Sequence, residues 1–126
     1  MPYEVNIQEE KDYLRVEVSG ERRPGHEVED SVATWSHVAK ICEEKKKDWV
    51  LGMFNVSGRL PTPAAYALAF NPESYGWSRR LKLALVVVHE ESRQDALFVE
   101  DVAVSSGYQI RIFDDEEKAT SWLLDK

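Results

Sequence analysis

The sequence has one cysteine, no long hydrophobic run and no excess of basic residues. The lone Cys42 excludes an intrachain disulfide and, with no His/Cys cluster near it, argues against a zinc site. The longest apolar run is far below the ~20 residues of a membrane-spanning helix, and the first residues lack a signal-peptide pattern. The net charge of -7 disfavours nucleic acid and anionic membranes as partners. We expect a cytoplasmic protein with no metal, cofactor, nucleic-acid partner or stable membrane insertion.

The sequence also lacks the short motifs that identify common enzymes. It has no glycine-rich phosphate loop, no His-Glu-x-x-His, no Gly-x-Ser-x-Gly and no Cys-x-x-Cys. We therefore expect a protein without enzymatic activity, and an enzyme that uses His89 is the alternative.

The strongest positive signal is the run Leu81–Val88, in which Lys82 is the only polar residue. A strand with one solvated face alternates apolar and polar residues, so this unbroken run predicts a strand buried on both faces. Asp48–Val56 has the same character, and Gly52 within it suggests close approach by a neighbour. Both segments are predicted to be interior strands.

Strands and helices alternate along the rest of the chain. The periodicities predict further strands at Tyr3–Gln8, Tyr13–Ser19 and Tyr108–Phe113, and helices at Glu27–Lys46, Pro63–Phe70, Arg93–Ser106 and Asp115–Leu124. The 126 residues are expected to form one domain, residues 1–126. This order predicts an α/β fold with a mixed five-stranded sheet and about four helices, in which a hairpin of two strands precedes parallel strands joined by right-handed crossovers.

Capping residues predict where the helices begin. Thr62, Ser92 and Asp114 are predicted to cap the last three helices, and Asp95 would complete a capping box with Ser92. The segment Glu73–Arg80 is predicted to be a loop.

The last third of the chain carries a family resemblance. From Phe98 to Leu123 the sequence FVEDVAVSSGYQIRIFDDEEKATSWL resembles the SpoIIAA-like family, which includes STAS and SEC14-type domains. The shared features are a glycine-containing loop, a strand that ends in Phe, an acidic helix cap and Ala-x-x-Trp-Leu. The predicted order of strands and helices also fits this family. The resemblance implies a SpoIIAA-like (STAS) fold.

The resemblance also implies two kinds of function. Well-studied relatives are anti-sigma-factor antagonists that are switched by phosphorylation of a serine near the helix after the third strand. At the matching place this chain offers the hydroxyls of Ser57 and Thr62 as candidate phospho-acceptors. The SEC14-type relatives imply instead an apolar or lipid-like ligand.

Candidate binding residues gather after the predicted strands, where open α/β sheets bind ligands. Thr62 at a helix start, with Arg59 beside it, forms a candidate anion site. The alternative is a purely structural role, in which Thr62 caps its helix and Arg59 is solvated. Tyr75 and Trp77, in the loop beside Arg79 and Arg80, could line a lid over an apolar groove together with Tyr66, or the loop could fold down over the sheet edge. The residues expected to bind a ligand or partner are Arg59, Thr62, Tyr66, Tyr75, Trp77, Arg79, Arg80 and His89.

The leading hypothesis from the sequence is a small, non-enzymatic SpoIIAA-like module. It would bind a protein partner or a small apolar ligand through the segment Gly58–Arg80. The first alternative is the phosphorylation switch at Thr62 or Ser57, and the second is an enzyme that uses His89. An exposed edge strand could also pair to form a homodimer.

Overall fold

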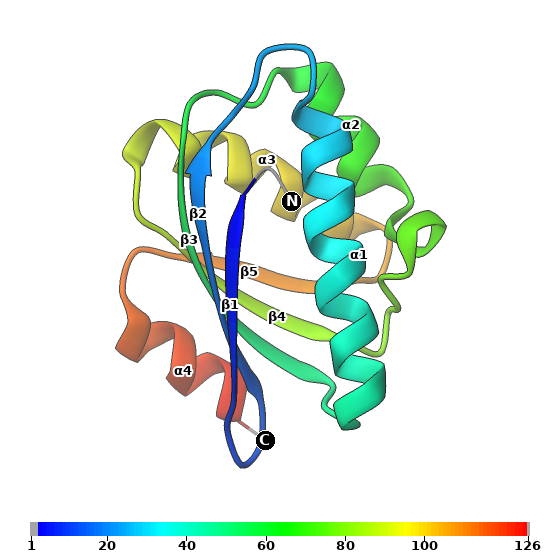
Figure 1. The fold of residues 1–126 in the computed structure, drawn as a ribbon, viewed down its shortest axis with the longest axis vertical. Helices are drawn as coiled ribbons and strands as arrows, with labels where there is room; N and C mark the ends of the chain where they lie inside the picture. Colours follow the sequence, from blue (N-terminus) through cyan, green and yellow to red (C-terminus); the bar gives the residue numbers. More distant parts are fainter. Residues whose placement is uncertain (1–2, 126) are drawn as a thin grey trace.

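The computed structural model describes residues 3–125, and strands and helices alternate along them after an initial pair of strands (Figure 1). The strands are β1 (Glu4–Glu9), β2 (Leu14–Glu21), β3 (Trp49–Ser57), β4 (Lys82–Val87) and β5 (Gln109–Phe113). The helices are α1 (Glu27–Lys45), α2 (Thr62–Phe70), α3 (Glu90–Ser105) and α4 (Glu116–Leu124), with a 3₁₀ turn, η1 (Pro72–Tyr75). The 3₁₀ turn occupies part of the segment predicted to be a loop.

All five strands form one mixed sheet in the order β1-β2-β3-β4-β5. β1 and β2 pair antiparallel, and the other three neighbouring pairs are parallel. The predicted fold class is therefore confirmed, and the topology is consistent with a STAS-like arrangement. The two strands predicted to be interior, β3 and β4, each lie between two neighbours, and β1 and β5 lie at the edges.

Two helix starts are displaced by one residue from the prediction. α2 begins at Thr62, so Pro61 occupies the N-cap position and no side chain caps the helix. At α4 the cap is Asp115, whose carboxylate accepts the N–H of Lys118 at 3.0 Å, and not Asp114. The α4 prediction failed because the adjacent Asp114 and Asp115 have the same capping chemistry, and the α2 prediction failed because helix ends shift by one residue without a local signal.

The start of α3 differs more, and the reason is tertiary. The helix begins at Glu90 with His89 at the N-cap, which places Ser92 inside the first turn. The Ser92 hydroxyl donates to the carbonyl oxygen of Val56 at 2.8 Å, and Asp95 accepts hydrogen bonds from the chain after β3. The predicted capping box is wrong because Ser92 bonds to the end of β3 and Asp95 to the segment that follows it.

Three helices cover one face of the sheet and the fourth covers the other. Right-handed crossovers that advance across a sheet in one direction place all their helices on the same side, which accounts for α1, α2 and α3. α4 follows the last strand and packs on the opposite face (Figure 1). The residues buried in this smaller layer are Leu51, Ala84, Val86, Ala119 and Leu123.

The single polar residue of the central apolar strand has a structural role. The ammonium group of Lys82 lies at the end of α4 and donates to the carbonyl oxygens of Trp122 and Leu123, both at 3.0 Å. The last carbonyls of a helix have no partners within the helix and favour a positive charge. Lys82 therefore joins the central strand to the carboxyl end of α4.

The two sheet edges are protected differently. The N–H of Ile112 on β5 is donated to the carboxylate of Glu100 on α3 at 2.7 Å, so this edge group is already bonded. β1 begins with Glu4 and ends with Glu9, and self-pairing in an antiparallel sense would bring such charges together. The homodimer suggested for an edge strand stays a prediction.

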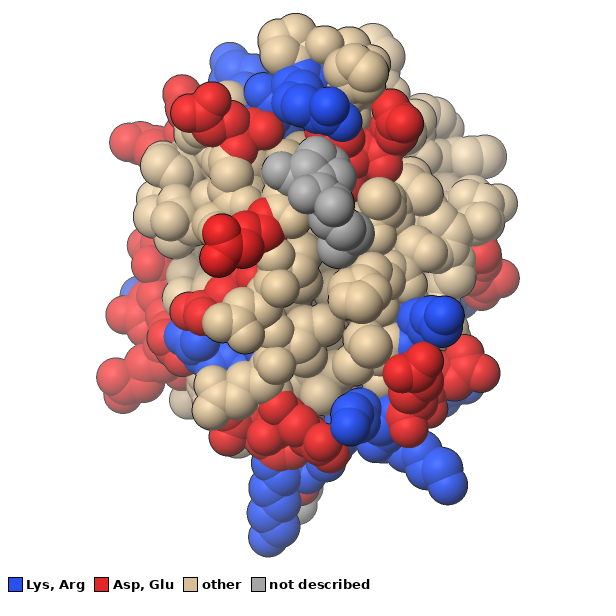
Figure 2. All heavy atoms as spheres, in the orientation of Figure 1, with Lys and Arg blue, Asp and Glu red and all other residues tan. Residues whose placement is uncertain are grey.

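The surface mixes charges of both signs. On the face shown in Figure 2, acidic and basic side chains surround a largely uncharged centre, and lysines and arginines do not merge into one patch. Within residues 3–125, no helix combines the length and apolarity needed to cross a membrane.

Gly52 in β3 allows the close packing that the sequence suggested. A Cβ atom there would lie 2.6 Å from Leu85 Cδ1 and 3.6 Å from the ring of Trp35 on α1. The absence of a side chain thus leaves room above β3 for the Leu85 side chain of the neighbouring strand.

Replacement of Gly52 by valine is expected to lower the free energy of unfolding by about 1–3 kcal/mol, because the added methyl groups overpack this contact. Gly52→Ala should lose less, since the flexible end of Leu85 is its nearest contact. Urea unfolding monitored by tryptophan fluorescence measures both. Wild-type stability in Gly52→Val would contradict the close approach.

Candidate ligand-binding site

A hollow lies between the sheet and the three helices on its larger covered face. Its volume is about 90 Å³. α2 packs against α1 and α3 and spans the gap between them. The apolar walls come from every surrounding element and include Trp35, Phe54, Leu68, Leu85 and Val99. We call this space the inter-helix hollow.

A second, smaller hollow of about 40 Å³ lies next to the first. Trp35, Leu68, Tyr75 and Val99 line both, so only side chains separate the two spaces. Typical pockets for drug-sized ligands measure about 300–1,000 Å³, whereas an apolar cavity of about 150 Å³ holds benzene. The space available here therefore suits a ligand of only a few heavy atoms.

One end of the inter-helix hollow is polar. Arg22 follows β2, and its Nη1 donates to the hydroxyl of Ser31 at 2.9 Å and to that of Tyr3 at 3.3 Å. The guanidinium lies 5.5 Å from the ring centre of Phe54. Its buried Nε has no hydrogen-bond partner among the described residues. Ser92 supplies a further hydroxyl to this end of the lining.

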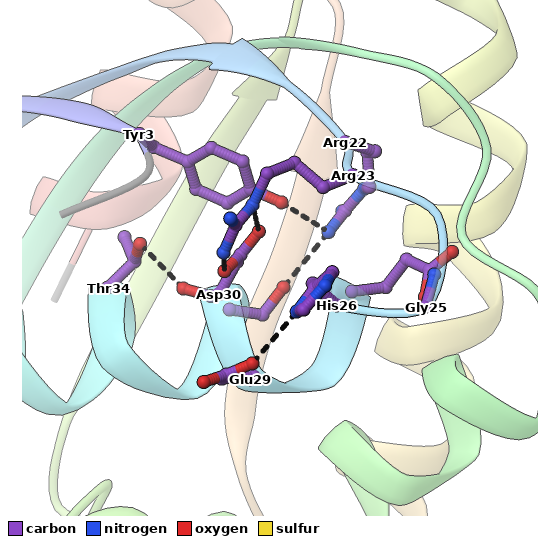
Figure 3. A network of polar contacts seen from close by, with 10 residues as sticks. Tyr3, Arg22, Arg23, Gly25, His26, Glu29, Asp30 and Thr34 are labelled. Carbon is purple, nitrogen blue, oxygen red and sulfur yellow. Dashed lines mark hydrogen bonds and ion pairs between the residues drawn. The ribbon is translucent and has the colours of Figure 1, made fainter.

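The side chain of the neighbouring Arg23 is bonded to the first turns of α1 (Figure 3). It forms two hydrogen bonds with the carboxylate of Asp30, whose side chain is 1% exposed. The hydrogen bonds from Arg23 lower the pKa of Asp30 below its usual value of 3.8. The same turn contains a contact of 3.0 Å between His26 and Glu29.

Arg59, predicted to bind an anion beside Thr62, already has a carboxylate partner. Its Nε and Nη2 both lie 3.0 Å from the carboxylate of Asp95, which also accepts the N–H of Leu60 at 2.7 Å. Burial raises the pKa of Asp95, but these hydrogen bonds outweigh it, so the pKa lies below its ordinary value. Arg59 thus ties the chain after β3 to α3.

The three aromatic residues expected to form a lid occupy different places. Tyr75 lines both hollows, donates its hydroxyl to the carbonyl oxygen of Leu68 at 2.9 Å, and has its pKa raised by burial to about 12. Trp77 is buried and lines only the smaller hollow. Tyr66 is 49% exposed on the outer side of α2, where it stacks on Phe70 at 5.4 Å.

Arg79 and Arg80 form surface contacts away from the inter-helix hollow. Arg79 pairs with Glu73 at 2.6 Å and donates to the carbonyl oxygen of Ser106 at 2.9 Å. Arg80 contacts the carboxylate of Asp48 at 3.2 Å. Both side chains fasten the loop before β4: Arg79 joins it to the end of α3, and Arg80 joins it to the residue before β3.

His89 lies at the predicted sheet edge but is directed to the other face. Its Nε2 contacts the side-chain oxygen of Asn55 at 2.7 Å, and Asn55 lines a surface hollow of about 310 Å³ on the half of that face that α4 leaves open. Ser57 ends β3 and Thr62 begins α2. Phosphorylation of Ser57 or Thr62, and catalysis by His89, stay predictions.

The lone cysteine is not a reactive thiol at neutral pH. Cys42 is buried, and burial raises the pKa of its thiol to about 11, so the thiol is protonated at neutral pH. Among residues 3–125, no group of three or more His, Cys, Asp or Glu side chains is placed to hold a metal ion.

Comparison with known proteins adds no assignment to this geometry. No family model matches the sequence. A search of curated proteins finds no significantly similar sequence.

Sequence reasoning missed the polar end of the inter-helix hollow. In the sequence, Arg22 lies in a polar segment between a predicted strand and a predicted helix, and Ser31 is one of many polar residues of that helix. Ser92 was assigned to a cap. The only available signal was the position of Arg22 directly after a strand, at the edge where α/β sheets bind ligands.

Asp30 gives the site a defined pH dependence of stability. A carboxylate whose pKa is lower in the folded state stabilises the fold above its unfolded pKa, and this contribution is lost as the pH falls. Asp30→Asn should lower the free energy of unfolding at pH 7 by about 1–2 kcal/mol, a modest loss because Arg23 is half exposed.

Urea unfolding of both proteins between about pH 5 and pH 2 measures this effect. The wild type should lose more stability than Asp30→Asn over this range, although Asp95 contributes to the slope of both. Asp12→Asn, an exposed change in the β1–β2 turn, is the control. Parallel slopes for wild type and Asp30→Asn would contradict the assignment.

Proposed function

We propose that this protein is a non-enzymatic, SpoIIAA-like module that binds a small, mainly apolar ligand in the inter-helix hollow. The observation that carries the proposal is an apolar space with a polar end, on the face of the sheet that α1, α2 and α3 cover. Ligand sites of proteins commonly combine apolar walls with a few oriented polar groups.

The position of the inter-helix hollow supports this proposal. Arg22 follows β2, and Ser92 lies in the first turn of α3, after β4, so the polar end lies at the carboxyl edge of the parallel strands. This is the edge at which open α/β sheets bind ligands. The helix that covers the inter-helix hollow, α2, packs mainly against α1 and α3. Its displacement would open the hollow to a ligand and leave the sheet intact.

The size of the space limits the ligand. A lipid or a drug-sized molecule needs several times the present volume, whereas a short apolar molecule fits after small movements of Tyr75 or Leu68. We therefore propose a ligand of a few carbon atoms and not a long acyl chain.

Xenon provides a direct test, since it enters dry apolar cavities without needing a polar partner. Under xenon pressure, the methyl NMR signals of Val99 and Leu68 should shift in the wild type. Ala96→Leu should abolish these shifts, because Ala96 lines the inter-helix hollow and the larger side chain fills it.

The matched control is Ala67→Leu, which makes the same change on the outer side of α2, where the alanine is exposed. It should leave the xenon-induced shifts in place. Absence of shifts in the wild type, or equal shifts in Ala96→Leu, would overturn a binding site in this hollow.

A further inference from the structure

The arginines near the inter-helix hollow differ in their partners. Arg23 has Asp30, and Arg59 has Asp95, each through two hydrogen bonds. Among residues 3–125, no ion pair joins Arg22 to a carboxylate. It donates only to two neutral hydroxyls, and its Nε is buried and unpartnered.

The neighbouring acids are engaged elsewhere. Asp30 and Asp95 each receive hydrogen bonds from their own arginine. The exposed Glu91 accepts the backbone N–H of Gly58 at 3.2 Å. A buried donor without a partner lowers stability, and one on a guanidinium favours a charged acceptor. Arg22 is therefore the group at this end with capacity left for an anion.

The hydroxyls beside Arg22 add to this capacity. Ser31 accepts its hydrogen bond from Arg22, so its own hydrogen is free to donate. Ser92 donates to the carbonyl oxygens of Val56 and Gly58 and fixes the wall of the hollow there. One free guanidinium N–H and one hydroxyl suit the two oxygens of a carboxylate.

We infer that the ligand of the inter-helix hollow is a short-chain monocarboxylate whose carboxylate is bound by Arg22 and Ser31 and whose alkyl chain lies among Trp35, Leu68 and Val99. This inference rests on the proposed function and names the chemical class of its ligand. A single negative charge matches the one guanidinium in the lining of the inter-helix hollow, and the volume sets a chain of roughly three to five carbons.

The test compares butyrate with butyramide, a neutral molecule of nearly the same shape. In NMR titrations of the wild type, butyrate should bind at least tenfold more tightly and should shift the Nε–H signal of Arg22. Arg22→Gln should weaken butyrate at least tenfold and bring it to the level of butyramide. Arg22→Lys, which keeps the charge but not the planar fork, should recover only part of the loss.

Arg80→Gln is the control for loss of a positive charge, since Arg80 contacts Asp48 away from the hollow. It should bind butyrate like the wild type. Equal binding of butyrate and butyramide to the wild type overturns the carboxylate assignment even where Arg22→Gln fails to fold. Unchanged butyrate affinity in a folded Arg22→Gln protein overturns it as well.

The xenon experiment separates this inference from the proposed function. Xenon entry that Ala96→Leu blocks, together with no preference for butyrate, would retain the ligand site and reject the carboxylate. No entry of xenon and no binding of either compound would reject both.

Discussion

The direction in which the chain crosses the sheet is the constraint on which the rest of the structure depends. β2 to β5 follow one another without a reversal, so α1, α2 and α3 share one face. α1 is held over β3 by the stacking of Trp35 on Phe54, with ring centres 6.3 Å apart, and α3 packs on β4 and β5. α2 packs on these two helices, and the space beneath its side chains is the inter-helix hollow.

The same constraint leaves the opposite face thinly covered. α4 packs over Leu51, Ala84 and Val86 and is fastened by Lys82, but it does not reach the carboxyl half of the strands. His89 and Asn55 meet on that open half. The edge that the sequence treated as one candidate site therefore has two environments, one enclosed by helices and one open to solvent.

The fold was predictable because its signals are local and repeated. The apolar runs around Lys82 and around Gly52 indicated two interior strands, and the alternation of strands and helices indicated the fold class. The details of the site were not predictable, because they depend on contacts between distant segments. Ser92 has the chemistry of a helix cap, yet it bonds to a carbonyl 36 residues away. No local pattern distinguishes Arg22 from Arg23.

The partners of the arginines decide which of them has a binding role. A positive side chain after a strand suggests an anion site, but Arg59 and Arg23 stabilise the fold through buried or half-buried carboxylates. Two buried guanidinium Nε atoms lack partners among the described residues, those of Arg22 and Arg93. Of these two side chains, only Arg22 lines the inter-helix hollow. Since an unsatisfied buried donor lowers stability, the placement of this Nε beside an apolar space is the observation on which the proposed carboxylate site rests.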